Sequence, residues 1–436
     1  MKILRAGEKG FDRYLSEVEG RVAQDGFRLE REVRSILRDV RERGDRAIVH
    51  YSQVLDGLRN PIHELQVKRI EVKKAYRRVP REFIKTLERA TSRIRKFHQL
   101  LSKRLVLSLK GGERGIRLEQ VTRPLERVGI YVPGGKASYP STVLMAAIPA
   151  KVAGVSEILM VTPPQKEGIN PAVLVAADLA GVDRIYRVGG VQAIAALAYG
   201  TKSIPKVDKI VGPGNQYVAT AKKMVYGDVD IDMVAGPSEI VIVSDESTPP
   251  SFIAADLISQ AEHDEMAMAI LITTSEAFAR KVKEEMGRQL TSLKRRRIAS
   301  ASVNRRGAIL IVKDLEQALK CVNRIGPEHL ELAVSRPHTL MKRVKHAGAV
   351  FLGPHTPEAI GDYMAGPNHI LPTAGTARFS SPLGVEDFMK RTNLISFTKS
   401  ALTRFEKDVK RFAEWEGLEG HYRAVEIRMG PERRGI

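Results

Sequence analysis

Residues that could perform acid-base and metal-ligand chemistry stand at four places in the second half of the chain. These places are Gln260 with His263, Glu328 with His329, Asp362, and His421. An adjacent carboxylate and imidazole can pass protons near neutral pH, and imidazole, carboxylate and amide groups can share a metal ion. Seven of the ten histidines lie after position 260, among carboxylates. We interpret the four places as parts of one enzyme site.

The segment before His263 has the pattern of a helix. Pro249-Pro250-Ser251 is typical of a helix start. The apolar positions that follow share one face, namely Ile253, Ala254, Leu257, Ile258 and Ala261. Gln260 and His263 then fall one turn apart on another face, where two ligands can share one ion. A single histidine or aspartate is more commonly a solvated or hydrogen-bonded residue, so the indication comes from the set.

The pair Glu328-His329 follows Pro327 and admits two interpretations. Adjacent residues on a helix point about 100° apart, so the pair fits a loop or a helix start better than a helix interior. Glu328 could also lie near the positive end of a helix and stabilise it. A catalytic role and a capping role are compatible.

Composition limits the class of protein. The chain has 436 residues, 43% of them hydrophobic, which is enough for two or more domains. Its one cysteine, Cys321, excludes an internal disulfide and a thiolate metal cage, and we expect it in the core. No long uncharged apolar run and no signal-peptide pattern occur, so we expect a cytoplasmic protein without a membrane partner.

The formal charge of +20 raises the alternative of a nucleic-acid-binding protein. The densest basic stretches are residues 294–297 and Arg305-Arg306. They carry no interleaved aromatic residues for base stacking, and they match no known nucleic-acid module. We interpret them as a solvated face and expect no nucleic-acid partner.

The fold class expected is α/β, with two Rossmann-like open domains, the second inserted in the first, and a small helical C-terminal tail. The first 125 residues are charged and helical in pattern, and Val33, Ile36, Leu37 and Val40 share a face. Short apolar runs that alternate with helical stretches then predict parallel strands. These strands are expected at residues 128–132, 157–161, 184–188, 209–211, 240–243, 267–273, 308–312 and 349–352. After about Pro382 the pattern returns to charged helix.

Glycine follows three of these strands, in residues 131–135, 188–192 and 211–215. Ligands of such sheets bind at the carboxyl ends of strands, and glycine lets the backbone approach an anion at a helix start. None of the three completes the dinucleotide fingerprint G-x-G-x-x-G. Each alone is more commonly a tight turn than a cofactor loop.

Taken together, the motifs resemble those of the histidinol dehydrogenase family over essentially all of residues 128–421. The matching segments are 131–135, 139–145, 192–198, 212–215, 235–239, 259–264, 326–332, 356–359, 361–363, 366–369 and 419–421. Before residue 125 the similarity is loose, with residues 43–47 the clearest match.

The resemblance implies a site with one zinc ion per subunit and L-histidinol as substrate. The family's metal ligands fall on Gln260, His263, Asp362 and His421, a set that could also hold manganese or cobalt. Its further substrate contacts fall on Ser238, His329 and Glu416, and the metal ligands also contact the substrate. Glu358 and His369 are expected to support the ligands.

The resemblance further implies oxidation of L-histidinol through L-histidinal to L-histidine with two NAD⁺. His329 would act as base in the alcohol oxidation, and Glu328 would activate water for the second oxidation. NAD⁺ would be bound at Tyr131, Gln192 and Asn215. Some relatives oxidise other polyols such as sulfonated diols, which is the alternative substrate class.

The domain limits implied are 1–127 with 239–381 for metal and catalytic residues, and 128–238 for NAD⁺. Residues 382–436 would form a tail that completes the partner's site in a homodimer with shared active sites.

Overall fold

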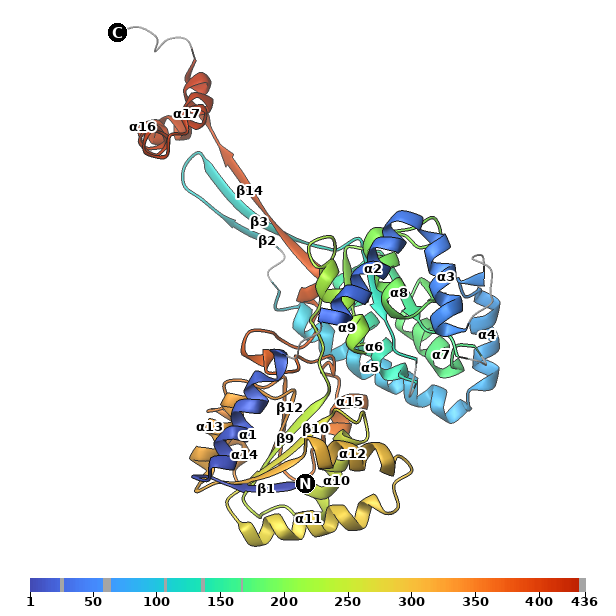
Figure 1. Cartoon of the computed structure of the whole chain (residues 1–436). Helices are drawn as coiled ribbons and strands as arrows, with labels where there is room; N and C mark the ends of the chain where they lie inside the picture. The colour runs from blue at the N-terminus through green and yellow to red at the C-terminus, as the bar shows by residue number, and fades with distance from the viewer. Residues whose placement is uncertain (24–26, 58–63, 106–107, 135–137, 166–167, 431–436) are drawn as a thin grey trace. The chain divides into compact units, whose positions relative to one another are not determined.

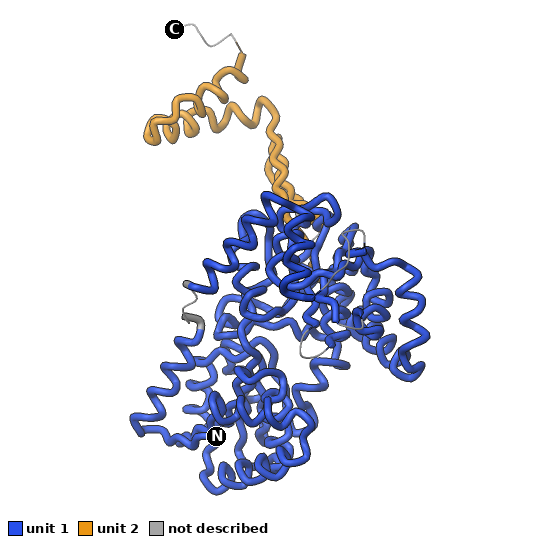
Figure 2. Tube along the Cα trace, turned by 45° about the vertical axis from the view of Figure 1, so that its right-hand side comes forward, with its two compact units in different colours: residues 1–102, 125–388 blue, residues 103–124, 389–436 orange. Residues whose placement is uncertain are grey.

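The structure is a computed structural model that describes residues 1–23, 27–57, 64–105, 108–134, 138–165 and 168–430. Two compact units divide the chain, and Figure 2 draws them in blue and orange. The first unit comprises Met1–Ser102 and Leu125–Phe388, and the second Lys103–Pro124 and Met389–Ile436. Within the described ranges, no helix combines the length and apolar content that crossing a membrane requires.

The first unit contains a five-stranded parallel sheet in the order β6-β5-β4-β7-β8. Its strands are β4 (Arg127–Tyr131), β5 (Glu157–Thr162), β6 (Arg184–Arg187), β7 (Lys209–Val211) and β8 (Asp230–Ile231). The crossover helices are α6 (Pro140–Ala153), α7 (Pro171–Ala180), α8 (Gly190–Tyr199) and α9 (Gln216–Val225). Because the winding reverses between β4 and β7, a topological switch point lies there.

Four helices from the N-terminal region pack on this sheet's helices. They are α2 (Phe27–Arg43), α3 (Asp45–Asp56), α4 (Arg69–Arg78) and α5 (Arg81–Ser102). The predicted apolar face of α2 is confirmed, because Val33, Leu37 and Val40 are buried in the core beside α8 and Ile36 packs against it. The domain limits expected from sequence remain predictions.

A second parallel sheet in the first unit has six strands in the order β1-β11-β10-β9-β12-β13. They are β1 (Lys2–Arg5), β9 (Glu239–Ser244), β10 (Met268–Thr273), β11 (Ala308–Ile311), β12 (His329–Ala333) and β13 (Ala349–Leu352). One face packs on α10 (Pro250–Ala261), α11 (Glu276–Leu290) and α12 (Arg296–Arg305). The other face packs on α1 (Lys9–Glu19), α13 (Leu315–Ile325) and α14 (Pro337–Met341) (Figure 1).

Successive side chains along each strand point to opposite faces of the six-stranded sheet, so they belong in turn to the two helix-covered cores. Ile240 and Ile242 belong to the core with α10, whereas Val241 and Val243 belong to the core with α13. Cys321 is buried in the α13 layer, as expected. In the basic run, Lys294, Arg296 and Arg297 are exposed and Arg295 is half-buried, so most of the run is solvated as expected.

The fold class is confirmed, but three strands of the first unit, β1, β8 and β12, were not expected. The predicted loop holds for Gly326, Pro327 and Glu328, but His329 begins β12. Gly326 ends α13 in the left-handed conformation, at φ 57°, so the glycine and Pro327 mark the end of a helix. Strand β12 pairs with both β9 and β13, which local sequence cannot show.

The second unit corrects the expectation of helix in two stretches. It contains an antiparallel sheet of β2 (Ser108–Gly111), β3 (Ile116–Pro124) and β14 (Met389–Phe397). In these strands charged residues interrupt the apolar ones, and β14 finds its backbone partners in β3, far away in sequence. The helices α16 (Lys399–Glu416) and α17 (Glu419–Glu426) follow, so the tail is α-helical only after residue 398.

Candidate active site

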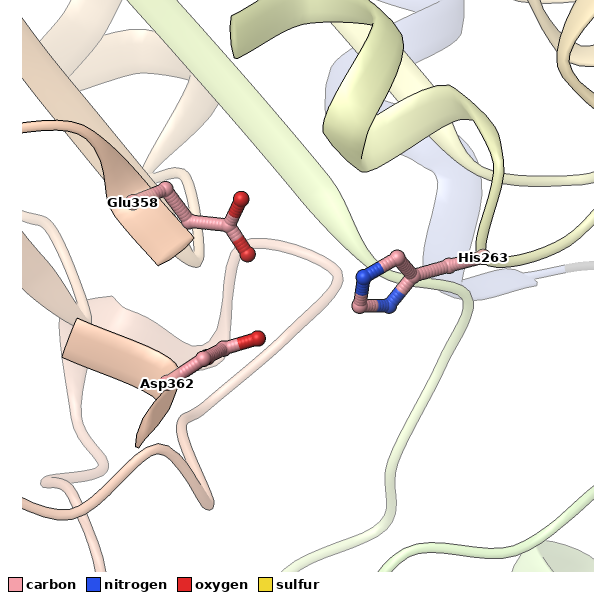
Figure 3. A group of neighbouring side chains, drawn as sticks. All are labelled: His263, Glu358 and Asp362. Atoms are coloured by element: carbon pink, nitrogen blue, oxygen red, sulfur yellow. The ribbon is translucent and has the colours of Figure 1, made fainter. Parts of the chain in front are cut away.

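A cluster of three metal-ligand side chains lies in the first unit. One ligand atom from each of His263, Glu358 and Asp362 lies within 4.8 Å of the others, and Figure 3 shows the imidazole beside the two carboxylates. Glu358 and Asp362 are four residues apart on α15 (Glu358–Tyr363), so they share a helix face. Glu358, expected only to support the ligands, is thus part of the cluster.

The predicted helix before His263 is confirmed as α10, although the histidine lies two residues past its end. The His263 N–H donates to the Gln260 carbonyl at 3.2 Å, which keeps the two residues one turn apart. The Gln260 side chain is fully buried.

Several buried polar atoms at the site lack hydrogen-bond partners within the described part of the chain. They are both amide atoms of Gln260, Nε2 of His329 and Oε1 of Glu358. Leaving a buried polar atom unpaired costs about 1–3 kcal/mol. A cation bound by Gln260, His263 and Asp362 would satisfy such atoms, and their nitrogen and oxygen types suit zinc. The residues therefore fit the zinc ion that the family resemblance implies.

His369 contacts Asp362 and favours the ionised form of its carboxyl group. Its Nδ1 lies 3.0 Å from the Asp362 carbonyl oxygen and 3.5 Å from Oδ1. Burial works against ionisation of Asp362, but the hydrogen bond and charge of His369 and the nearby imidazoles of His329 and His263 hold its pKa at about 2. Burial and the nearby Asp362 charge raise the pKa of Glu358 to about 7. The two carboxyl groups therefore differ in proton affinity.

Glu328 and His329 are both positioned by the backbone of Glu239, the first residue of β9. The Glu239 N–H donates to Glu328 Oε2 at 2.8 Å, and the Glu239 carbonyl lies 3.0 Å from His329 Nδ1. If Nδ1 carries the proton, Nε2 is left with its lone pair. Nε2 lies 4.0 Å from Glu358 Oε1. The imidazole thus directs its second nitrogen towards the metal-ligand cluster.

Burial also changes the pKa values of Glu328 and His329, in opposite directions. It raises the pKa of Glu328 well above its usual range, with repulsion from Glu239 adding to the effect. It lowers the pKa of His329, although the charge of Asp362 opposes the shift. A neutral imidazole and an ionised carboxylate are both able to accept a proton.

Sequence reasoning missed Arg21, the residue that holds the side chain of Glu239. Arg21 and Glu239 form a buried bidentate ion pair, with Nε–Oε1 and Nη2–Oε2 distances of 2.5 and 2.9 Å. The two residues are 218 positions apart, so no local signal could connect them. Ser238, a predicted substrate contact, is half-buried directly before β9.

The predicted cofactor residues lie at the carboxyl ends of the five-stranded sheet. Tyr131 ends β4, and its hydroxyl accepts from the Gly190 N–H at 3.1 Å. Gln192 is buried in α8 and donates to Asp56 at 3.2 Å. Asn215 accepts from two amides at the start of α9 and is its N-cap. Of the first glycine motif, Gly135 lies outside the described residues.

Gly212, in the third glycine motif, is held by a buried ion pair. Asp232 accepts from its N–H at 2.7 Å, and Lys222 donates both to its carbonyl, at 2.8 Å, and to Asp232. Gly212 has φ 111°, and a Cβ there would lie 2.2 Å from the Tyr131 carbonyl oxygen. Glycine is required because the turn passes so close to the end of β4.

The other two predicted site residues belong to the second unit. Glu416 is the last residue of α16, and His421 lies on α17. Both are exposed. The first unit therefore brings His263 together with Glu358 and Asp362, and the second unit carries the remaining predicted ligand.

Two parallel α/β sheets, with a buried acid-base pair beside a cluster that could hold a cation, are typical of an enzyme. A family model described as histidinol dehydrogenase matches residues 20–429. The histidinol dehydrogenase of Syntrophotalea carbinolica is 53% identical over 429 residues, covering 98% of this chain and 99% of that protein. That of Bacillus cereus is 53% identical over 405 residues, covering 93% and 94%.

A crystal structure of histidinol dehydrogenase from Elizabethkingia anophelis superposes with a TM-score of 0.90 at 36% identity, covering 98% of each chain. The chain belongs to the histidinol dehydrogenase family. Membership makes it an NAD-dependent oxidoreductase of histidine biosynthesis. The alternative substrate class, sulfonated diols, is not favoured.

Proposed function

We propose that this chain oxidises L-histidinol through L-histidinal to L-histidine, with zinc held by Gln260, His263, Asp362 and the partner's copy of residue 421. The overall change consumes one water and two NAD⁺ and yields two NADH and three protons. The observation that carries the proposal is the unpartnered Nε2 of His329, directed at the cluster of His263, Glu358 and Asp362. Zinc, when bound, would position the substrate and polarise its oxygen.

His329 is the proposed base of the first oxidation. Its Nδ1 is fixed against the Glu239 carbonyl, so Nε2 accepts the alcohol proton as hydride passes to the nicotinamide. The lowered pKa of His329 supports this role, because the imidazole is neutral before the reaction.

Glu328 is the proposed base of the second oxidation. It takes a proton from the water that adds to L-histidinal, and the resulting hydrate loses the second hydride. Its raised pKa makes the carboxylate a stronger base than an exposed glutamate. Ser238 and the partner's copy of residue 416 are the proposed further substrate contacts.

NAD⁺ is proposed to bind at Tyr131, Gln192 and Asn215. These residues follow or flank the carboxyl ends of β4, β6 and β7, and the helix starts at Gly190 and Gln216 offer N–H groups to the pyrophosphate.

The proposed assembly is a homodimer with shared sites, in the cytoplasm. His421 and Glu416 are exposed on the second unit, as ligands supplied to a partner would be in a single chain. Mixed dimers of His263→Asn with His421→Asn test this assembly. Shared sites leave one intact site per dimer, so activity should partly return. Folded, zinc-containing heterodimers without activity would contradict sharing.

The reaction itself is tested by stoichiometry. The zinc-loaded protein should form two NADH for each L-histidinol consumed and release L-histidine. One NADH with accumulation of L-histidinal would contradict the proposed role of Glu328. No oxidation of L-histidinol would contradict the substrate.

A further inference from the structure

Two carboxyl groups outside the proposed ligand set, those of Glu331 and Asp256, lie on elements that also carry residues of the candidate site. Glu331 lies on β12, two residues after His329 and therefore on the same face of the strand, and its side chain is buried. Asp256 lies on α10, one turn before Gln260, and is half-buried. The two side chains are neighbours, and burial together with the Asp256 charge raises the pKa of Glu331.

Glu331 also holds the start of α15. Its Oε1 accepts from the Glu358 N–H at 2.7 Å, in a buried hydrogen bond. The Ser259 hydroxyl on α10 adds a second link, because it donates to Glu358 Oε2 at 3.1 Å. The carboxyl pair thus joins three elements, and each carries a residue of the site: α10 with Gln260, β12 with His329, and α15 with Asp362.

We propose that Asp256 and Glu331 form a positioning pair that sets the separation of the ligands on α10 from those on α15. Without the pair, the face of α15 that carries Glu358 and Asp362 loses its buried connection to β12, and the geometry that the cation requires is no longer fixed. Groups that orient metal ligands typically contribute about 10–100-fold to metal affinity.

The variant Glu331→Met tests the pair, because it keeps side-chain length but removes the acceptor for the Glu358 N–H. Zinc affinity, measured by competition with a chromogenic chelator, should fall about 10–100-fold. Glu331→Gln should restore affinity to within about threefold, because the amide oxygen accepts from Glu358 and the NH₂ group can donate to the neighbouring Asp256.

Thr248→Val is the matched control. The Thr248 hydroxyl donates to the Ala333 carbonyl, at the other end of β12, in another buried hydrogen bond. This variant should lower the melting temperature and leave zinc affinity unchanged. If Glu331→Met does not fold, the double variant Asp256→Leu with Glu331→Met takes its place, because it removes both polar groups together.

The inference rests on the proposed metal ligands. The positioning pair and the ligand set can nevertheless be contradicted separately. Zinc lost in His263→Asn but bound normally by folded Glu331→Met would overturn the positioning pair alone. Zinc bound normally in both variants would overturn the ligand set itself. Equal loss in Glu331→Met and Glu331→Gln would also overturn the inference, since the amide keeps the acceptor for the Glu358 N–H.

Discussion

The two parallel sheets of the first unit have the same strand order. Their candidate site residues, however, lie at opposite ends of the strands. β6-β5-β4-β7-β8 and β11-β10-β9-β12-β13 have the same order when each set is numbered along the chain. The first sheet offers Tyr131 and Asn215 beyond the carboxyl ends of its strands. The second offers Glu328 and His329 at the amino end of β12.

The location of the candidate residues differs because helices begin beside the anion expected at the first sheet, whereas a helix ends beside the cation expected at the second sheet. At the carboxyl ends of the first sheet, α8 and α9 begin, and helix starts favour an anion such as pyrophosphate. At the amino end of the second sheet, α10 finishes near Gln260 and His263, and helix ends favour a cation. Strand order alone therefore does not decide where the chemistry of such a sheet lies.

The largest effect expected is the loss of zinc in His263→Asn. The chain has one cysteine, and it is buried in α13, so no thiolate can replace the imidazole. Zinc content should fall well below one per chain and turnover should be lost, while NADH still binds to the first sheet. Fluorescence titration with NADH beside metal analysis checks both. Joint loss of zinc and NADH binding would contradict separate sites.

A smaller effect is expected from Glu328→Gln, which keeps the shape but cannot accept a proton. Oxidation of supplied L-histidinal should slow by about 10²–10⁴-fold, more than the first hydride transfer from L-histidinol. Single-turnover kinetics with each substrate measure the two steps. Equal slowing of both would indicate that Glu328 serves to hold Glu239 rather than to activate water.

The first sheet can be perturbed without touching the metal. Gly212→Ala forces a side chain into a left-handed turn and against Tyr131, at a cost of about 1–3 kcal/mol. NADH should bind more weakly and the melting temperature should fall. Zinc content should stay at one per chain, and its loss would show that the two sheets are not independent. Gly227→Ala is a control, since its φ is 106° but its Cβ would meet no atom within 4 Å.

The last effect concerns the acid stability of the helices around the first sheet, and it leaves both candidate sites unchanged. His98 is buried on α5, and burial lowers its pKa from 6.5 to about 4. Between about pH 4 and 6.5, His98 therefore binds a proton in the unfolded chain but not in the folded chain. The free energy of unfolding falls as the pH drops from about 6.5 to 4. The expected loss is about 3 kcal/mol. His98→Leu should flatten this slope in urea unfolding; an unchanged slope would assign it to other groups.

Sequence predicted much of this arrangement because its signals were local. All eight expected strands are present within a few residues, and α10 starts at the predicted prolines. The strand at His329 was missed, although His329-Leu330-Glu331-Leu332 alternates polar and apolar residues, because Pro327 and the adjacent acid-base pair favoured a loop or a helix start. The cluster position of Glu358 was also missed, although its four-residue spacing from Asp362 was a usable signal. Asp256, Arg21 and Glu239 act through partners distant in sequence.

The β3–β14 ladder imposes an order on how the chain is made. Gln120 and Asn393, which are opposite each other in it, are 273 residues apart. At about 5–20 residues per second, β3 leaves the ribosome roughly 15–55 s before β14 exists. During that interval β3 can pair with β2 alone, and its other edge presents free backbone groups to any neighbouring chain. The second unit is therefore completed last, and nascent chains are exposed to edge-to-edge association until translation is nearly finished.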